Sequence, residues 1–96
     1  MWILRSSEAE GALTFRLPLG IDKTIGRASG ADFIVDVALV SRLHCQVTAG
    51  EERVDVQDLS STNGTFVNDA RIDRGQLASG DRLRVGRVEL TVQRLQ

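Results

Sequence analysis

Hydrophobic and polar residues alternate along this chain in many short runs. The alternation is clear over residues 13–17, 43–48, 53–57 and 88–92, as expected for strands that bury one face. No window of about eleven residues holds a convincing helical period. Around ten short strands at close spacing therefore indicate an all-β fold, a β-sandwich.

Turn-forming residues and breaks in the pattern predict how these strands are connected. Residues 7–10 match a helix capping box, but Gly11 follows directly and no apolar period develops. We therefore expect residues 6–12 to form a hairpin loop. Residues 33–35 are all apolar and are expected to form a buried strand, whereas 71–72 and 76–77 look like short edge pieces. We find no repeat or linker and expect residues 1–96 to form a single domain.

One stretch, residues 58–68, combines turn formers with hydroxyl groups between two predicted strands. Asn63-Gly64 is its strongest turn signal, because both residues tolerate the positive φ that a tight hairpin demands. Residues 60–62 add hydroxyls, and the exposed backbone adds N–H donors. Converging donors suit an anion, especially with arginines from elsewhere, and Gly26-Arg27 and residues 41–44 lie upstream at turn-like positions.

The numbers of basic and acidic residues indicate which classes of ligand the chain can bind. Twelve basic and thirteen acidic residues give a net charge of −1, which argues against a nucleic-acid partner. Lys23 is the only lysine among the basic residues. Arginine favours bidentate recognition of oxyanions, so this bias agrees with an anion site.

The remaining composition bears on location and cofactors. Cys45 is the only cysteine, so no intrachain disulfide can form and a reducing compartment is expected. It alternates with the core-facing Val47 and is expected to be a packed thiol. No apolar run approaches the roughly 18 residues of a membrane span, and the start lacks a signal peptide. We therefore expect a cytoplasmic protein with no membrane partner and, since no metal or nucleotide motif occurs, no cofactor.

Five short motifs occur in order along the chain, namely Gly26-Arg27, Ser41-x-x-His44, Ser61-Thr62-Asn63-Gly64, Leu77-x-x-Gly80-Asp81-x-Leu83 and Val85-Gly86. Together they resemble the forkhead-associated (FHA) domain. The resemblance covers nearly the whole chain, about Trp2 to Val92. It implies an FHA-like β-sandwich of about ten or eleven mostly short antiparallel strands, whose loops at one end bind phosphothreonine peptides without catalysis. The partner would then be a protein phosphorylated by an upstream Ser/Thr protein kinase.

The resemblance also assigns expected roles to five binding residues. The guanidinium fork of Arg27 can meet two phosphate oxygens. Ser41 would donate its hydroxyl to the phosphate, and Arg42 could donate through its side chain or backbone. Thr62 matches the position that contacts phosphate from the turn, and Asn63 the one that hydrogen-bonds the peptide main chain.

Three further residues are expected to support the site. Gly26 and Gly64 are interpreted as backbone-permitting positions rather than contacts. The FHA resemblance implies that His44 is a buried hydrogen-bonding strut that fixes the phosphate loops.

Two alternatives remain open at this point. An FHA-like scaffold could bind unphosphorylated protein instead. A hydrolase could use Ser41 as nucleophile and His44 as base, with Asp36 or Asp58 as orienter. However, no glycine-rich nucleophile elbow surrounds Ser41, so we expect no enzymatic activity.

Overall fold

The computed structural model describes residues 1–6 and 12–95. These residues form eleven strands and no helix. The strands are β1 (Trp2–Ser6), β2 (Thr14–Leu17), β3 (Asp22–Gly26), β4 (Phe33–Ile34), β5 (Cys45–Ala49), β6 (Val54–Asp58), β7 (Thr65–Val67), β8 (Ala70–Ile72), β9 (Arg74–Leu77), β10 (Arg82–Val85) and β11 (Val88–Arg94).

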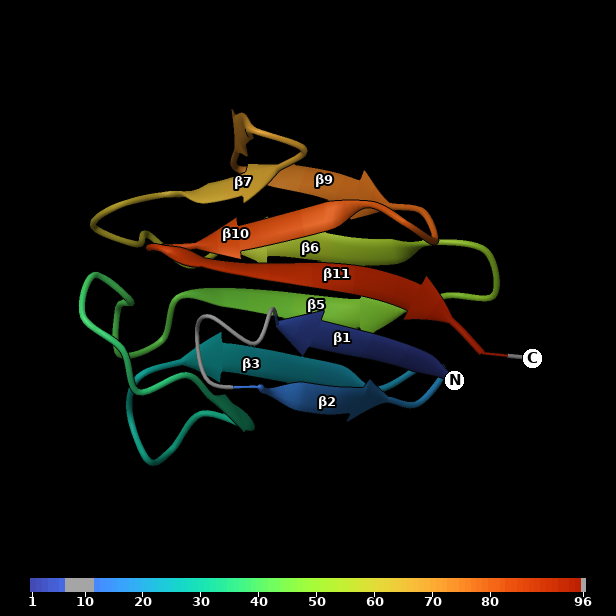
Figure 1. The fold of residues 1–96 in the computed structure, drawn as a ribbon, viewed down its shortest axis with the longest axis horizontal. Coiled ribbons are helices and arrows are strands. Elements are labelled where there is room, and N and C mark those ends of the chain that lie inside the picture. Colours follow the sequence, from blue (N-terminus) through green and yellow to red (C-terminus); the bar gives the residue numbers. More distant parts are fainter. Residues whose placement is uncertain (7–11, 96) are drawn as a thin grey trace.

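Two sheets pack face to face (Figure 1). In the described residues, one sheet has six strands in the order β2-β1-β11-β10-β7-β8, and the other has five in the order β4-β3-β5-β6-β9. Neighbouring strands are antiparallel except the pair β3 and β4. The predicted sandwich of ten or eleven mostly antiparallel strands is confirmed, and the pieces expected at sheet edges are the edge strands β8 and β9.

The core lies between the sheets and follows the predicted alternation. In β11 the side chains of Val88, Leu90 and Val92 are buried, while Thr91 between them is exposed. Val54 and Val56 of β6 alternate in the same way. Each strand thus gives one face to the core, which is the main driving force for this fold.

Cys45 is a packed thiol, as predicted. Its side chain is fully buried in the core cluster. Burial raises the pKa of the thiol to about 12, and the charge of Asp58 acts in the same direction. A thiol in this environment is protonated and unreactive near neutral pH.

Asn63-Gly64 is not the tight hairpin that its sequence suggested. Strands β6 and β7, on either side, belong to different sheets, so the loop crosses between sheets. Gly64 has a φ of 91°, but Asn63 is not among the left-handed residues. The two-residue hairpin turn is instead Asn68-Asp69, with φ values of 47° and 72°, and it joins β7 to β8. Both residue types accept such angles, as this turn requires.

Two other local predictions concern a strand and a hairpin loop. The strand predicted at residues 33–35 covers only Phe33–Ile34 and lies at a sheet edge, so Ile34 remains 44% exposed. The hairpin loop predicted over residues 6–12 lies mostly outside the described residues. At its base the backbone N–H of Ser6 donates to the Leu13 carbonyl, and β1 pairs with β2 as expected.

The connections that carry the predicted site lie at one end of the sandwich. Figure 1 shows the β3–β4, β4–β5 and β6–β7 connections together at the left, while the N-terminus and the end of β11 lie at the right. Because these connections leave strands of a packed core, their bases are held in fixed positions.

We predict that Leu90→Ala lowers the free energy of unfolding by about 2–5 kcal/mol, since it removes a fully buried side chain from a central strand. The matched control is Thr91→Ala on the exposed side of the same strand, expected to change it by less than about 0.5 kcal/mol. Urea unfolding measures both. Equal effects would contradict the assignment of the two faces.

Candidate functional site

A cleft of about 660 Å³ opens at the loop end of the sandwich. Residues from the β3–β4, β4–β5 and β6–β7 connections line it. The structure brings together in this cleft all five predicted binding residues, namely Arg27, Ser41, Arg42, Thr62 and Asn63.

The side chain of Arg27 is anchored at one nitrogen and free at the other two. Its backbone N–H donates to the Ser41 carbonyl at 2.9 Å, and its Nε donates to the Val40 carbonyl at 3.1 Å. No ion pair involves Arg27 within residues 1–6 and 12–95. The two terminal nitrogens therefore remain available as a planar fork in an exposed, pre-oriented position.

Ser41 and Thr62 connect two of the three loops. The backbone N–H of Thr62 donates to Oγ of Ser41 at 3.0 Å. Because a hydroxyl can accept and donate at once, the proton of Ser41 remains available to a ligand. The Thr62 side chain is exposed and lines the same cleft.

His44 joins the same two loops from beneath. Its side chain is completely buried. Nδ1 accepts the backbone N–H of Ser41 at 3.0 Å, and Nε2 lies 2.8 Å from the Gly64 carbonyl. An Nδ1 that accepts carries no proton, so Nε2 carries it and donates to Gly64.

This geometry gives no support to a Ser–His catalytic pair. The ring of His44 contacts the backbone nitrogen of Ser41, not its hydroxyl. Its other nitrogen is occupied by the Gly64 carbonyl. A general base must reach the proton that it removes, and here both ring nitrogens are engaged elsewhere.

Gly26 and Gly64 are placed where another residue would clash with the backbone or be strained. A Cβ on Gly26 would lie 2.0 Å from the backbone oxygen of Arg42. This close approach allows β3 to pack against the segment that carries Ser41. Gly64 has a left-handed φ of 91°, its N–H donates to Oγ of Ser61, and its carbonyl accepts from His44.

Asp58 organises the β6–β7 loop. Its carboxylate accepts the backbone N–H and the hydroxyl of Ser61, at 3.1 and 2.5 Å, and the hydroxyl of Thr65 at 2.7 Å. Burial raises the pKa of Asp58, but the hydrogen bonds from Ser61 and Thr65 together outweigh it and hold the pKa below its usual value. The ionised carboxylate therefore stabilises this loop.

Asn63 and Leu39 link the loops across the top of the cleft. Nδ2 of Asn63 donates to the Leu39 carbonyl at 2.9 Å. Its amide oxygen has no partner among the described residues and can accept from a peptide N–H. Leu39 has a φ of 75°, an uncommon conformation for leucine, and its backbone oxygen lies 2.8 Å from where a Cβ on Gly86 would be.

Six residues that line the cleft were missing from the predicted site, namely Asp36, Ala38, Leu39, Val40, Leu43 and Ser60. Ser60 is exposed with a φ of 57° and was recognisable only as part of the hydroxyl run. Leu39 and Asp36 also line the cleft. No local sequence signal predicts a left-handed leucine. Asp36 lies at the cleft because the β4–β5 connection that carries it follows an irregular path.

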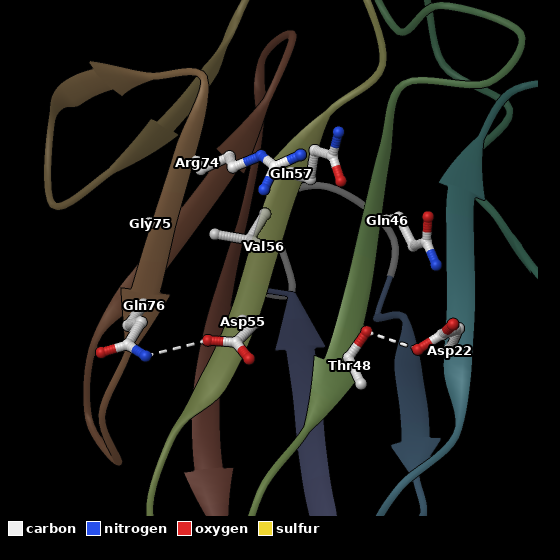
Figure 2. Close-up of a pocket in the computed structure, with 9 residues that line it drawn as sticks. All are labelled: Asp22, Gln46, Thr48, Asp55, Val56, Gln57, Arg74, Gly75 and Gln76. Carbon is white, nitrogen blue, oxygen red and sulfur yellow. Dashed lines mark hydrogen bonds between the residues drawn. The ribbon is translucent and has the colours of Figure 1, made fainter.

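A second depression, of about 490 Å³, lies on the outer face of the five-stranded sheet (Figure 2). Its two carboxylates, Asp22 and Asp55, accept hydrogen bonds from Thr48 at 2.6 Å and from Gln76 at 3.0 Å. Arg74 is the only basic residue among the described residues that line it. The carboxylates make this surface much less suited to an anion than the cleft at the loops.

Metal and membrane features were also searched within the described residues. This part of the chain contains no group of three or more His, Cys, Asp or Glu side chains able to hold a metal ion. It likewise contains no helix with the length and apolar character needed to cross a membrane.

Comparison with known proteins gives consistent matches. The FHA domain family model matches residues 23–86. The FHA domain-containing protein FhaA of Mycobacterium tuberculosis is 39% identical over 79 residues, which make up 82% of this chain and 15% of FhaA. This chain spans less than half the length of the curated relatives it matches.

Solved structures agree with the family match. The FhaA FHA domain in complex with the intracellular domain of Rv3910 has a TM-score of 0.86 and 34% identity, covering 97% of this chain and 100% of that one. A structure from a study of phosphothreonine-dependent FHA domain interactions has a TM-score of 0.88 and 34% identity, covering 99% of this chain and 97% of that one.

Gly26→Ala is expected to destabilise the protein by at least about 2 kcal/mol, because the new Cβ would overlap the Arg42 backbone, which cannot rotate away. Gly30→Ala, in the adjacent loop, is the matched control. Its Cβ would meet nothing within 4 Å, and a small stabilisation of up to about 1 kcal/mol is expected. Thermal unfolding of both variants measures the difference. Similar melting temperatures would disprove the close approach.

The loop carboxylate predicts a pH dependence of stability. Because the folded-state pKa of Asp58 is lowered, its contribution is complete above the unfolded value of about 3.9 and is lost as pH falls through the folded value. Asp58→Asn should therefore lose less stability than wild type between about pH 4 and pH 2. A residual loss is expected from Asp32 and Asp81, whose pKa values are also lowered. Parallel curves of melting temperature against pH would refute this role.

Proposed function

Because the chain belongs to the FHA domain family, we propose that it binds phosphothreonine peptides in the cleft at its loop end, without catalysing a reaction. FHA domains are recognition modules. The proposal extends this family property to the cleft lined by Arg27, Ser41, Arg42, Thr62 and Asn63.

The observation that carries the proposal is the convergence of unused donors on one cleft. The terminal nitrogens of Arg27 and the hydroxyl protons of Ser41 and Thr62 have no partner among the described residues. A phosphothreonine offers about −1.5 to −2 charges and three acceptor oxygens at neutral pH. Each charged hydrogen bond contributes roughly 1.5–3 kcal/mol. A few such bonds to a flexible peptide suggest micromolar binding, about −8 kcal/mol.

Each cleft residue then has a distinct proposed role. Arg27 binds two phosphate oxygens, Ser41 and Thr62 each donate a hydroxyl to the phosphate, and Arg42 adds positive potential from the rim. Asn63 hydrogen-bonds the peptide main chain through the part of its amide group that is not bonded to the Leu39 carbonyl, including the amide oxygen.

The supporting residues act through position. Gly26 allows the segment that carries Ser41 to approach β3, and Gly64 accepts from His44. His44 keeps the Ser41 and Gly64 backbones at a fixed separation. We therefore propose that the site is assembled before the ligand arrives, which lowers the entropic cost of binding.

The comparisons support the class of partner. One matched FHA domain comes from work on phosphothreonine-dependent interactions, and another is bound to the intracellular domain of a second protein. We propose that this chain, as one FHA module over residues 1–96, binds a protein phosphorylated by a Ser/Thr protein kinase in the cytoplasm. The engaged nitrogens of His44 support a binding role without catalysis.

The decisive test is a titration of labelled peptides that carry phosphothreonine, phosphoserine or unmodified threonine in otherwise identical sequences. Label fluorescence is preferable to that of Trp2, which is completely buried and hydrogen-bonded to the Gly50 carbonyl. Only the phosphothreonine peptide should bind tightly. Arg27→Ala should weaken it by at least about 100-fold, because it removes two charged hydrogen bonds.

Arg53→Ala is the control, since this exposed arginine lies in the turn between β5 and β6. It should bind as wild type does. Equal binding of phosphorylated and unphosphorylated peptides would instead favour the alternative, an FHA-like scaffold for phosphate-independent protein binding.

A further inference from the structure

We propose that a second anion subsite, made by Arg71 and Arg84 on either side of Phe66, flanks the phosphate cleft. Its ligand is a carboxylate or a second phosphate on the same peptide, a few residues from the phosphothreonine. The inference rests on the proposed function and goes further, because it states which charge a preferred peptide carries outside the phosphothreonine.

The three side chains form one row across the six-stranded sheet. Phe66 of β7 is opposite Arg71 of β8 and opposite Arg84 of β10. The neighbours of Phe66 in β7, Thr65 and Val67, pair with the buried Val85 and Leu83. Since side chains alternate between faces, Phe66 and both arginines lie on the outer face.

Stacking fixes one of the two guanidinium groups. Cζ of Arg84 lies 4.0 Å from the centre of the Phe66 ring, a cation–π contact. The guanidinium group keeps its positive charge in this contact, and its N–H groups are the donors with which an arginine binds an oxyanion.

Arg71 brings the row next to the cleft. A Cβ placed on Gly64 would lie 2.8 Å from Nε of Arg71 and 3.2 Å from the Phe66 ring. Arg71 therefore lies over the backbone that directly follows Asn63 and Thr62. Gly64 comes two positions after Thr62, so their Cα atoms are at most about 7.6 Å apart. An extended peptide advances about 3.3 Å per residue. A side chain about two or three positions from the phosphothreonine therefore reaches Arg71.

Glu89 of β11 is opposite Arg84 in the sheet, but its ion pair is with Arg82. Arg82, on the same face of β10, pairs with Asp69 at 3.0 Å and with Glu89 at 3.6 Å. Neither Arg71 nor Arg84 has an ion pair with any residue in 1–6 and 12–95.

The cleft has charges of both signs on the side of the β4–β5 connection, which contributes Asp36 and Arg42 to its lining. Arg71 and Arg84, from β8 and β10, lie outside that lining and add positive charge on the side of the six-stranded sheet.

The test uses phosphothreonine peptides that differ at one flanking position, scanned over three residues on each side. Each position carries Ala, Glu, Lys or phosphothreonine in turn, so that carboxylate and phosphate are compared directly. At the favoured position we expect Glu to bind about two- to fivefold more tightly than Ala, and the doubly charged phosphate to bind at least as tightly as Glu. The gain should shrink with added salt.

Charge reversal separates ligand recognition from a merely structural effect. Arg71→Glu should bind the Ala-flanked peptide more weakly than wild type, because it places a negative charge close to the phosphate. It should also reverse the preference, so that Lys-flanked peptides bind more tightly than Glu-flanked ones. Arg84→Gln should reduce the preference without reversing it. Arg16→Gln is the matched control, because this exposed arginine lies in β2, at the opposite edge of the same sheet.

The outcomes distinguish this subsite from the proposed function. If no phosphothreonine peptide binds, the proposed function fails, and the subsite fails with it. If the peptides bind and Arg27→Ala abolishes binding, but flanking charge has no effect in wild type or Arg71→Glu, only the subsite is disproved. A preference that is equally lost in Arg16→Gln would assign it to overall charge and would also overturn the subsite.

Discussion

The site depends on the buried side chain of His44, which joins the β4–β5 connection to the β6–β7 connection. His44 accepts the backbone N–H of Ser41 and donates to the backbone carbonyl of Gly64. Both contacts are to main-chain atoms, so they fix the path of the loops and leave the hydroxyl of Ser41 available to a ligand. Each partner is a buried or half-buried polar group that would cost free energy if it were left unpaired. The histidine thus couples the stability of the fold to the shape of the cleft.

The sandwich makes this arrangement possible because it delivers the ends of several strands to one place. The segment with Ser41 follows the five-stranded sheet's edge strand β4, and the loop with Thr62 crosses from that sheet to the other. Gly26 permits the close contact between β3 and the Ser41 segment, while the ionised carboxylate of Asp58 holds the crossing loop from its base. Rigid loops above a packed core are a suitable support for recognition of a small, highly charged group.

Much of the fold could be predicted because strands are encoded locally, by alternation along runs such as Val88 to Val92. The cleft residues could be selected together because their order resembles a known family. The route of the chain between sheets could not be predicted in this way. Asn63-Gly64 has the composition of a hairpin turn, yet tertiary packing assigns its two neighbouring strands to different sheets. No sequence signal marks the left-handed Leu39, whose carbonyl accepts from the amide of Asn63 and lies close to Gly86 in the folded chain.

The most direct measurement is a titration of the ¹⁵N-labelled protein with a phosphothreonine peptide, followed by NMR of the backbone amides and the imidazole. We predict large shifts at Arg27, Ser41, Thr62 and Asn63, with small ones on the outer face of the five-stranded sheet. His44 should show the neutral Nε2–H form before and after binding, because the site is assembled beforehand. Shifts centred on the outer sheet face, or a His44 ring that takes this form only with peptide bound, would contradict the account.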